Sequence, residues 1–204
     1  MAKLYYKYGT MNSSKTANAL MTRFNYVEKN RDVLMLKSAK DTRSDSFITT
    51  RAGIPPVQCI LFFENESLVE VFHRENKKLI EKKGKKYDII IIDECQFMTK
   101  EQVEQAKDIV DIYNVSVFCF GLKTNYVTEL FEGSKRLLEL ADSIAEIKSI
   151  CKCGNKATIN ARIKDGKVVK KLLGDTDIDI GAEDKYESMC YRCYINAEEY
   201  KENE

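Results

Sequence analysis

The segment from Gly9 to Thr16 has the residue types and spacing of a phosphate-binding loop. It follows a strand-like stretch and fits the pattern G-x-x-x-x-G-K-[ST], except that Ser14 replaces the second glycine. In such a loop, backbone N–H groups surround phosphate oxygens, Lys15 would reach the β- and γ-phosphates, and Thr16 would ligate Mg²⁺. The positive end of the following helix would face the same anion. The predicted phosphate site consists of Gly9, Thr10, Met11, Asn12, Ser13, Ser14, Lys15 and Thr16.

Two adjacent carboxylates, Asp93 and Glu94, follow a run of four isoleucines from Ile89 to Ile92. Such a continuous apolar run is typical of a strand buried on both faces of a parallel sheet, and ligands bind beyond the carboxyl ends of such strands. One carboxylate can hold Mg²⁺ while the other takes a proton from an acceptor hydroxyl. The alternative is an exposed acidic turn, which the buried strand in front of the pair disfavours. The pair and the loop together indicate phosphoryl transfer.

Four of the seven cysteines form two close pairs, Cys151 with Cys153 and Cys190 with Cys193. Four thiolates in two pairs separated by a longer loop fit a tetrahedral Zn²⁺ site, and a closed set of four protein ligands predicts a structural role. The alternative, four unrelated core cysteines, is disfavoured because both pairs fall in one short segment. The other cysteines are predicted to be buried or neutral thiols: Cys59, Cys95 and Cys119.

Alternating strands and helices are expected to position these groups. Periodicity and turn residues predict strands at residues 3–8, 33–36, 87–92, 115–120 and 144–150, and helices at residues 16–28, 67–82 and 134–141. Another helix is expected after Thr99, which can form a capping box with Gln102. Residues 38–66, which contain two adjacent prolines, are predicted to be irregular. This order predicts an α/β fold with a mostly parallel sheet flanked by helices.

The character of the chain changes at Cys151. Paired cysteines, short β-like stretches and a charged tail replace the alternation of strands and helices. We therefore expect an α/β domain at residues 1–150 and a small metal-binding domain at residues 151–204.

The composition limits the classes of partner. Thirty-three Lys and Arg against 32 Asp and Glu leave a net charge of +1, so nucleic acid is not expected as the main ligand. No apolar run approaches the ~20 residues that a membrane span needs, and the N-terminal residues lack a signal-peptide layout. We therefore expect no membrane partner and a cytoplasmic location. His73, the single histidine, is predicted to lie on the surface, which disfavours histidine-based nucleophilic catalysis.

Seven motifs are distributed along essentially the whole chain. They are Gly9–Thr16, Lys40–Arg43, Thr50–Gly53, Asp93–Phe97, Gly121–Tyr126, Phe131–Ser134, and Ile180–Tyr186 leading into Cys190–Cys193. In combination they resemble the type II thymidine kinase family. The resemblance implies a P-loop, recombinase-like sheet with a C-terminal zinc-ribbon or lasso domain. It also implies transfer of the γ-phosphoryl group of ATP to the 5′-hydroxyl of thymidine, a nucleoside-salvage reaction that supplies DNA synthesis.

The resemblance further implies individual residue roles. Glu94 would accept the proton of the thymidine hydroxyl, and Asp93 would lie on the Mg²⁺ side. Arg43 and Gln96 would join the ATP and phosphate-binding set. The apolar enclosure of the base and sugar would consist of Met11, Phe97, Leu122, Tyr126 and Phe131. A lasso that contains Gly181 and ends at Tyr186 would grip thymine through backbone groups, anchored by the zinc module at Cys153 and Cys190.

The family commonly forms homotetramers and is restrained by thymidine triphosphate, and the resemblance implies both properties here. The implied metals are a structural Zn²⁺ and the Mg²⁺ that accompanies ATP. Ser14 departs from the family pattern, because a Cβ at that position would clash within a close-packed loop or shift its backbone. Two alternatives follow: a P-loop protein that senses nucleotide without efficient catalysis, and a zinc-ribbon nucleic-acid ATPase, which the near-zero net charge disfavours.

Overall fold

A six-stranded parallel sheet forms the centre of the computed structural model, which describes residues 1–42, 45–170 and 185–200. The strands lie in the order β5-β2-β6-β7-β1-β8, and every neighbouring pair is parallel. Their bounds are β1 Leu4–Tyr8, β2 Val33–Ser38, β5 Ile60–Phe62, β6 Ile89–Asp93, β7 Ser116–Gly121 and β8 Ser143–Glu146. The predicted α/β class and its mostly parallel sheet are therefore confirmed.

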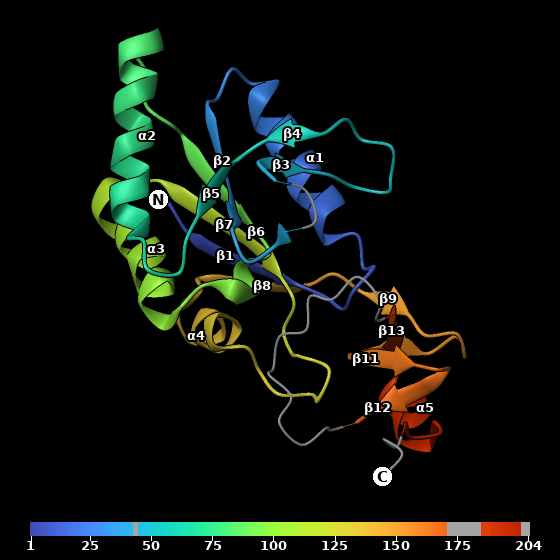
Figure 1. Cartoon of the computed structure of the whole chain (residues 1–204). Coiled ribbons are helices and arrows are strands. Elements are labelled where there is room, and N and C mark those ends of the chain that lie inside the picture. Colours follow the sequence, from blue (N-terminus) through green and yellow to red (C-terminus); the bar gives the residue numbers. More distant parts are fainter. Residues whose placement is uncertain (43–44, 171–184, 201–204) are drawn as a thin grey trace.

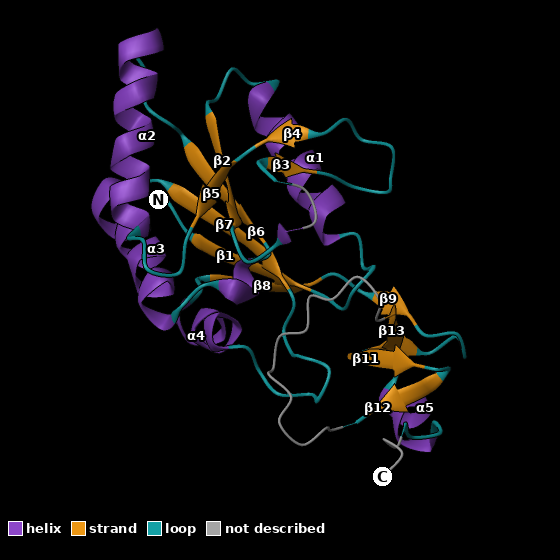
Figure 2. Ribbon diagram, in the orientation of Figure 1, coloured by secondary structure: helices purple, strands orange, loops and turns teal. Residues whose placement is uncertain are grey.

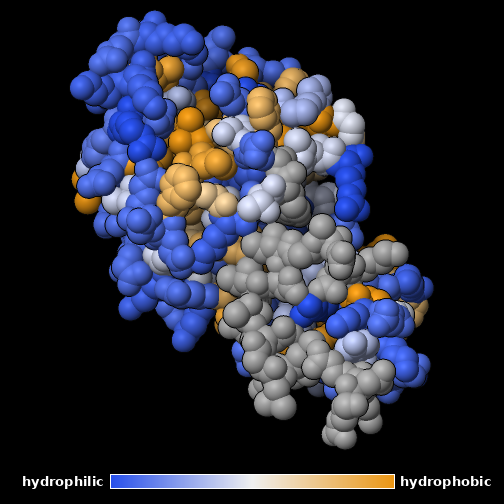
Figure 3. Space-filling model, viewed as in Figure 1, coloured by the Kyte–Doolittle hydropathy of each residue, from blue (hydrophilic) through white to orange (hydrophobic). Residues whose placement is uncertain are grey.

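Helices cover both faces of this sheet (Figure 1, Figure 2). On one face lies α1 (Lys15–Val27), and on the other lie α2 (Leu68–Lys83), α3 (Lys100–Tyr113) and α4 (Glu132–Leu140). Alternate residues of β6 explain the layering: Ile90 and Ile92 pack with α2, α3 and α4, whereas Ile89 and Ile91 pack with α1. The continuous apolar run thus reflects burial on both faces. The outer surface of α2 is hydrophilic (Figure 3), as in an amphipathic helix.

A smaller module follows the sheet. In it β9 (Ser149–Ile150) pairs with β10 (Lys156–Ala157), and a three-stranded antiparallel sheet has the order β12-β11-β13. The bounds of the remaining elements are β11 Ile159–Lys164, β12 Lys167–Val169, β13 Lys185–Met189 and α5 Tyr191–Asn196. Two further short elements complete the described chain: the hairpin of β3 (Phe47–Ile48) and β4 (Val57–Gln58), and the 3-10 turn η2 (Cys95–Phe97).

Two expectations about the elements were wrong in part. Residues 38–66 were predicted to be irregular, yet they contain β5, which forms one edge of the main sheet, and the β3–β4 hairpin, which packs near α1. The stretch 144–150 was expected to close the sheet as one strand. Only Ser143–Glu146 does so, because the chain leaves the sheet after Glu146 and Ser149–Ile150 pairs with β10 instead.

Local signals at helix ends were more reliable. Thr99 caps α3 as predicted: its Oγ1 accepts from the Gln102 N–H at 3.2 Å, and the Gln102 side-chain oxygen accepts from the Thr99 N–H at 3.1 Å.

His73 is exposed on α2, as predicted, and hydrogen-bonds the Tyr113 hydroxyl at 2.9 Å. None of the helices in the described part of the chain has both the length and the apolar character of a membrane span.

Burial of β6 predicts a large cost for truncating one of its side chains. Ile91 is 0% exposed, whereas Ile112 on α3 is 69% exposed. We expect Ile91→Ala to lower the free energy of unfolding by about 3 kcal/mol, because it removes buried apolar contacts and leaves a cavity. The control Ile112→Ala should change it by less than about 0.5 kcal/mol. Urea unfolding followed by circular dichroism measures both, and similar losses in the two variants would contradict the assignment of β6 to the core.

Candidate active site

Loops that follow three adjacent strands meet at the carboxyl edge of the sheet. β1, β7 and β6 are neighbours in the sheet. The 9–14 loop follows β1, the loop after Gly121 follows β7, and the Glu94–Phe97 turn follows β6. The Gly9 N–H donates to the Gly121 carbonyl oxygen at 3.3 Å, so the loops after β1 and β7 start side by side. This is the edge at which ligands of open α/β sheets bind.

The 9–14 loop has the form that its sequence predicts. A Cβ on Gly9 would lie 2.3 Å from Ser13 Oγ and 2.5 Å from the Ile147 carbonyl oxygen, so only glycine fits there. Lys15 is buried at the start of α1, and its Nζ donates to the Thr10 carbonyl oxygen at 2.7 Å. The first turn of α1 presents backbone N–H groups at the same place. The loop can therefore surround an anion with backbone amides and a lysine.

Ser14 occupies the position of the second glycine in the loop pattern, and the loop accommodates its side chain. Its φ is 64° and its ψ is 25°, a left-handed conformation that glycine adopts freely, and its side chain is exposed. Asn12 also has a positive φ, 60°. The left-handed backbone at a non-glycine residue costs about 1 kcal/mol, which the surrounding structure must offset. The expected clash of the serine Cβ within the loop is therefore not found, since the side chain faces outward.

Asp93 ends β6 beside the helix that carries Thr16. Its side chain is 3% exposed, and its Oδ1 has no hydrogen-bond partner within the described residues. Burial and then the charge of Glu94 raise the pKa of Asp93 to about 7, whereas a hydrogen bond with the Thr16 hydroxyl and the charge of Lys15 lower it. A buried carboxylate oxygen without a partner, next to a hydroxyl, is a donor set that fits a hard cation such as Mg²⁺.

Glu94 is held in a defined orientation by Gln96. Glu94 has a left-handed backbone, with φ 53° and ψ 41°, and is buried before η2. The Gln96 Nε2 donates to Glu94 Oε2 at 2.7 Å, and the Gln96 Oε1 accepts from the Leu122 N–H at 2.9 Å. The Leu122 bond fixes which end of the amide faces the carboxylate. Gln96 was predicted to bind phosphate, but in this structure both ends of its amide join Glu94 to the loop after β7.

Sequence reasoning missed the role of Gly121 in this arrangement. A Cβ on Gly121 would lie 2.5 Å from Gln96 Oε1 and 2.7 Å from Cys95 Sγ, so a side chain there would displace the Gln96 amide. Its position at the end of β7 is the one available signal. Leu122 is fixed in turn, because its carbonyl oxygen accepts from the Tyr6 hydroxyl at 2.9 Å and from Ser134 Oγ at 2.6 Å.

Several predicted lining residues of the base and sugar enclosure lie on these same loops. Phe97 and Phe131 pack edge to face with ring centroids 6.1 Å apart, and both are half-buried, as are Met11 and Leu122. Tyr126 is buried, and the Arg162 guanidinium lies 5.3 Å from its ring centroid. Tyr186 is half-buried on β13, directly paired with Arg162. Arg43 and Gly181, which were predicted to bind phosphate and thymine, lie outside the described residues.

The two cysteine pairs come together in the smaller module. The Sγ atoms of Cys151, Cys153, Cys190 and Cys193 all lie within 4.8 Å of one another, and those of Cys153 and Cys190 are 3.6 Å apart. Four ligands about 2.3 Å from a tetrahedral Zn²⁺ would lie roughly 3.8 Å apart, so the geometry fits that ion. Hydrogen bonds, first from the Asn155 backbone N–H, lower the pKa of Cys153 to about 6, whereas hydrogen bonds with Cys153 and Cys190 raise the pKa of Cys193 to about 12, so the four thiols share protons in the absence of metal. The other three cysteines are buried elsewhere, as predicted.

The burial of Asp93 predicts that the free energy of unfolding depends on pH when no metal or nucleotide is added. Its folded pKa, about 7, exceeds the ordinary value of 3.8, so the stability that the protonated carboxyl contributes is complete below about 3.8 and is lost as the pH rises from there to about 7. We expect Asp93→Asn to be more stable than the parent at pH 8 by about 1 kcal/mol, and the difference to shrink at pH 6. Urea unfolding at both pH values measures it. The exposed Asp108→Asn serves as control, and an Asp93→Asn curve parallel to that of the parent would contradict the burial argument.

Comparisons with known proteins point to one family. A sequence profile described as thymidine kinase matches residues 2–194. The chain is 39% identical over 196 residues to a thymidine kinase of Zymomonas mobilis, covering 96% of this chain and 97% of that protein. It is 42% identical over 201 residues to a thymidine kinase of Streptococcus pyogenes serotype M3, covering 97% and 100%. A thymidine kinase of Haemophilus influenzae is 40% identical over 192 residues, covering 93% and 94%.

Proposed function

The chain belongs to the thymidine kinase family, and on that basis we propose that it transfers the γ-phosphoryl group of ATP to the 5′-hydroxyl of thymidine. The family match and the relatives support thymidine as the acceptor. One structural observation carries the reaction class: the Lys15 loop and the Asp93–Glu94 pair lie at one edge of the sheet, beside the Phe97–Phe131 pair. Phosphoryl transfer needs such positioning and charge neutralisation more than it needs covalent chemistry.

The phosphate loop would bind and orient the triphosphate. Its backbone amides and Lys15 would neutralise the charge of the phosphate oxygens, and Arg43 would add a second cation by family match. Thr16 and Asp93 would hold Mg²⁺, whose charge offsets that of the β- and γ-phosphate oxygens. Asp93 would then be ionised, because a cation beside the carboxylate opposes the effect of burial.

Glu94 would act as the proton acceptor. As the 5′-oxygen of thymidine forms its bond to the γ-phosphorus, the bond from that phosphorus to the β,γ-bridging oxygen breaks, and the hydroxyl proton passes to the Glu94 carboxylate. Gln96 would act as a positioning residue, since its amide fixes one carboxylate oxygen of Glu94. This role differs from the phosphate contact expected from the sequence.

The base and sugar would lie against the apolar side of the same loops. Phe97 and Phe131 would exclude water from the transferring group, with Met11, Leu122 and Tyr126 completing the enclosure. Gly181 and Tyr186 would belong to the backbone grip on thymine. In this proposal residues 1–150 form the ATP-binding domain and residues 151–204 the lasso domain. A cytoplasmic homotetramer that is restrained by thymidine triphosphate is the assembly that the family resemblance implies.

Glu94, the proposed proton acceptor, allows a direct test of the mechanism. We expect Glu94→Gln to lower kcat by about 100-fold or more, because it removes the proton acceptor, while ATP affinity stays within about twofold of the parent. Label transfer from ATP to thymidine measures turnover, and calorimetric titration measures binding. Glu101→Gln, an exposed glutamate on α3, is the matched control and should behave like the parent. Equal losses of turnover and ATP binding would show that Glu94 has a structural role instead.

The cysteine cluster is proposed to hold one structural Zn²⁺, and its loss should be measurable as metal content and stability. We expect Cys153→Ser to lose the ion and to lower Tm by about 5 °C or more, because metal binding contributes to folding. Cys59→Ala removes a thiol outside the cluster and should retain the ion. Atomic absorption and thermal denaturation provide the readouts. Retention of one zinc ion by Cys153→Ser would contradict the ligand assignment.

A further inference from the structure

The smaller module contacts two residues of the phosphate loop: the Ser149 hydroxyl hydrogen-bonds the Thr10 hydroxyl, and two side chains hold the backbone of Met11. The Met11 N–H donates to Asn160 Oδ1 at 2.7 Å, and the Met11 carbonyl oxygen accepts from the Ser188 hydroxyl. Asn160 on β11 and Ser188 on β13 are direct cross-strand partners, so their side chains emerge on the same face of that small sheet. Both backbone hydrogen-bonding groups of Met11 are thus engaged by one pair of side chains from the other module.

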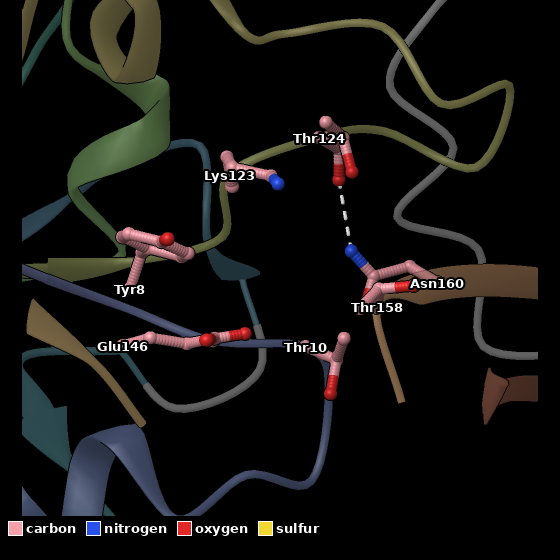
Figure 4. Close-up of a pocket in the computed structure, with 8 residues that line it drawn as sticks. Tyr8, Thr10, Lys123, Thr124, Glu146, Thr158 and Asn160 are labelled. Carbon is pink, nitrogen blue, oxygen red and sulfur yellow. Dashed lines mark hydrogen bonds between the residues drawn. The ribbon is translucent and has the colours of Figure 1, made fainter. Parts of the chain in front are cut away.

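The same Asn160 side chain also holds the loop after β7. Its Nδ2 donates to the Thr124 carbonyl oxygen at 2.8 Å, a contact drawn in Figure 4. Asn160 is 3% exposed, and its two partners fix the orientation of the amide, because the N–H of Met11 requires the oxygen and the carbonyl of Thr124 requires the nitrogen. One buried amide therefore bridges the loop after β1 to the loop after β7.

Two other side chains of the module also contact the loop after β7. Arg162 lies two residues after Asn160, on the same face of β11, and its guanidinium is 5.3 Å from the Tyr126 ring centroid. The Tyr194 hydroxyl donates to the Tyr126 carbonyl oxygen at 3.4 Å. The module thus contacts both ends of the segment from Thr124 to Tyr126, and Tyr126 belongs to the proposed thymidine enclosure.

The cysteine cluster lies beside these contacts in the chain. Ser188 precedes Cys190 by two residues, and Tyr194 directly follows Cys193. A metal ion that fixes Cys190 and Cys193 would therefore also fix the side chains that reach Met11 and Tyr126. The module contacts both sides of the site through residues close to its ligands.

We propose that Asn160 is a positioning residue for phosphoryl transfer, which sets the placement of the ATP-binding loop relative to the thymidine-binding loop. This inference rests on the proposed function for the identities of the two ligands. It assigns to the metal-binding module a role on the nucleotide-phosphate side of the site in addition to the thymine side. Asn160 touches neither ligand in this account and acts through Met11 and Thr124.

Three substitutions separate the two halves of the bridge. Asn160→Ala removes both hydrogen bonds, and we expect it to raise KM for ATP and for thymidine by about five- to tenfold each. Asn160→Asp keeps an oxygen that accepts from Met11 N–H but has no donor for the Thr124 carbonyl, so it should raise KM for thymidine alone. Ser188→Ala removes only the contact to the Met11 carbonyl oxygen and should raise KM for ATP alone.

Hydrogen–deuterium exchange tests the same bridge without any turnover. In the whole protein, Asn160→Ala should speed exchange in peptides covering residues 9–14 and 122–126, and Asn160→Asp only in the second. Asn196→Ala, an exposed asparagine on α5, is the control, and zinc content should stay at the parent level in all variants. Unchanged KM values together with exchange changes spread evenly over the whole chain would indicate a merely structural role and overturn the proposal.

A wrong function and a wrong role for Asn160 would give different results. If the parent does not phosphorylate thymidine, the proposed function is wrong, and the exchange data still decide whether Asn160 couples the loops. If the parent is active and the three variants show parental KM values and parental exchange, the inference about Asn160 is wrong while the proposed function stands.

Discussion

The candidate site depends on the close approach of two backbone segments at the carboxyl ends of β1 and β7. Gly9 and Gly121 are joined by a hydrogen bond of 3.3 Å, and a Cβ at either position would meet neighbouring atoms at 2.3 to 2.5 Å. Without that approach, the Lys15 loop would not lie beside the turn that carries Glu94, and the Gln96 amide would have no space. Two residues without side chains thus permit the crowded arrangement of the charged ones.

The charged groups of this region are retained at a cost in stability. Asp93 lacks a partner for one oxygen within the described residues, and Lys37, its register neighbour on β2, is 1% exposed with Asp41 at 3.7 Å. Left-handed backbone at Ser14 and Glu94 adds strain in the same place. Binding of a cation would supply the partner that Asp93 Oδ1 lacks, so the protein without ligands carries an unfavourable term that its proposed ligands relieve.

The sequence predicted what depends on local pattern. The isoleucine run gave β6 correctly, Thr99 and Gln102 gave the start of α3, and the spacing of Cys151, Cys153, Cys190 and Cys193 gave the cluster. It missed β5, because three residues carry too little periodicity to identify a strand. It also missed the bond between Gln96 and Leu122, 26 residues apart, and those of Asn160 to Thr124 and Met11, 36 and 149 residues apart, because the packing of separate elements sets these pairs. Local signals therefore identified the groups that we propose to react, whereas non-local packing determines what supports them.

The hydrogen bond from the Ser188 hydroxyl to the Met11 carbonyl oxygen joins residues that are 177 positions apart. During synthesis, the entire main sheet leaves the ribosome before β13 does, and it can fold while the remainder is still being made. A polypeptide released between residues 160 and 188 would contain every strand of that sheet and the whole phosphate loop, yet lack Ser188, one of the two side chains that bind the Met11 backbone. The order of translation thus places completion of this loop after synthesis of the whole main sheet, and loss of the residues from 188 onward would affect the phosphate loop as well as the smaller module.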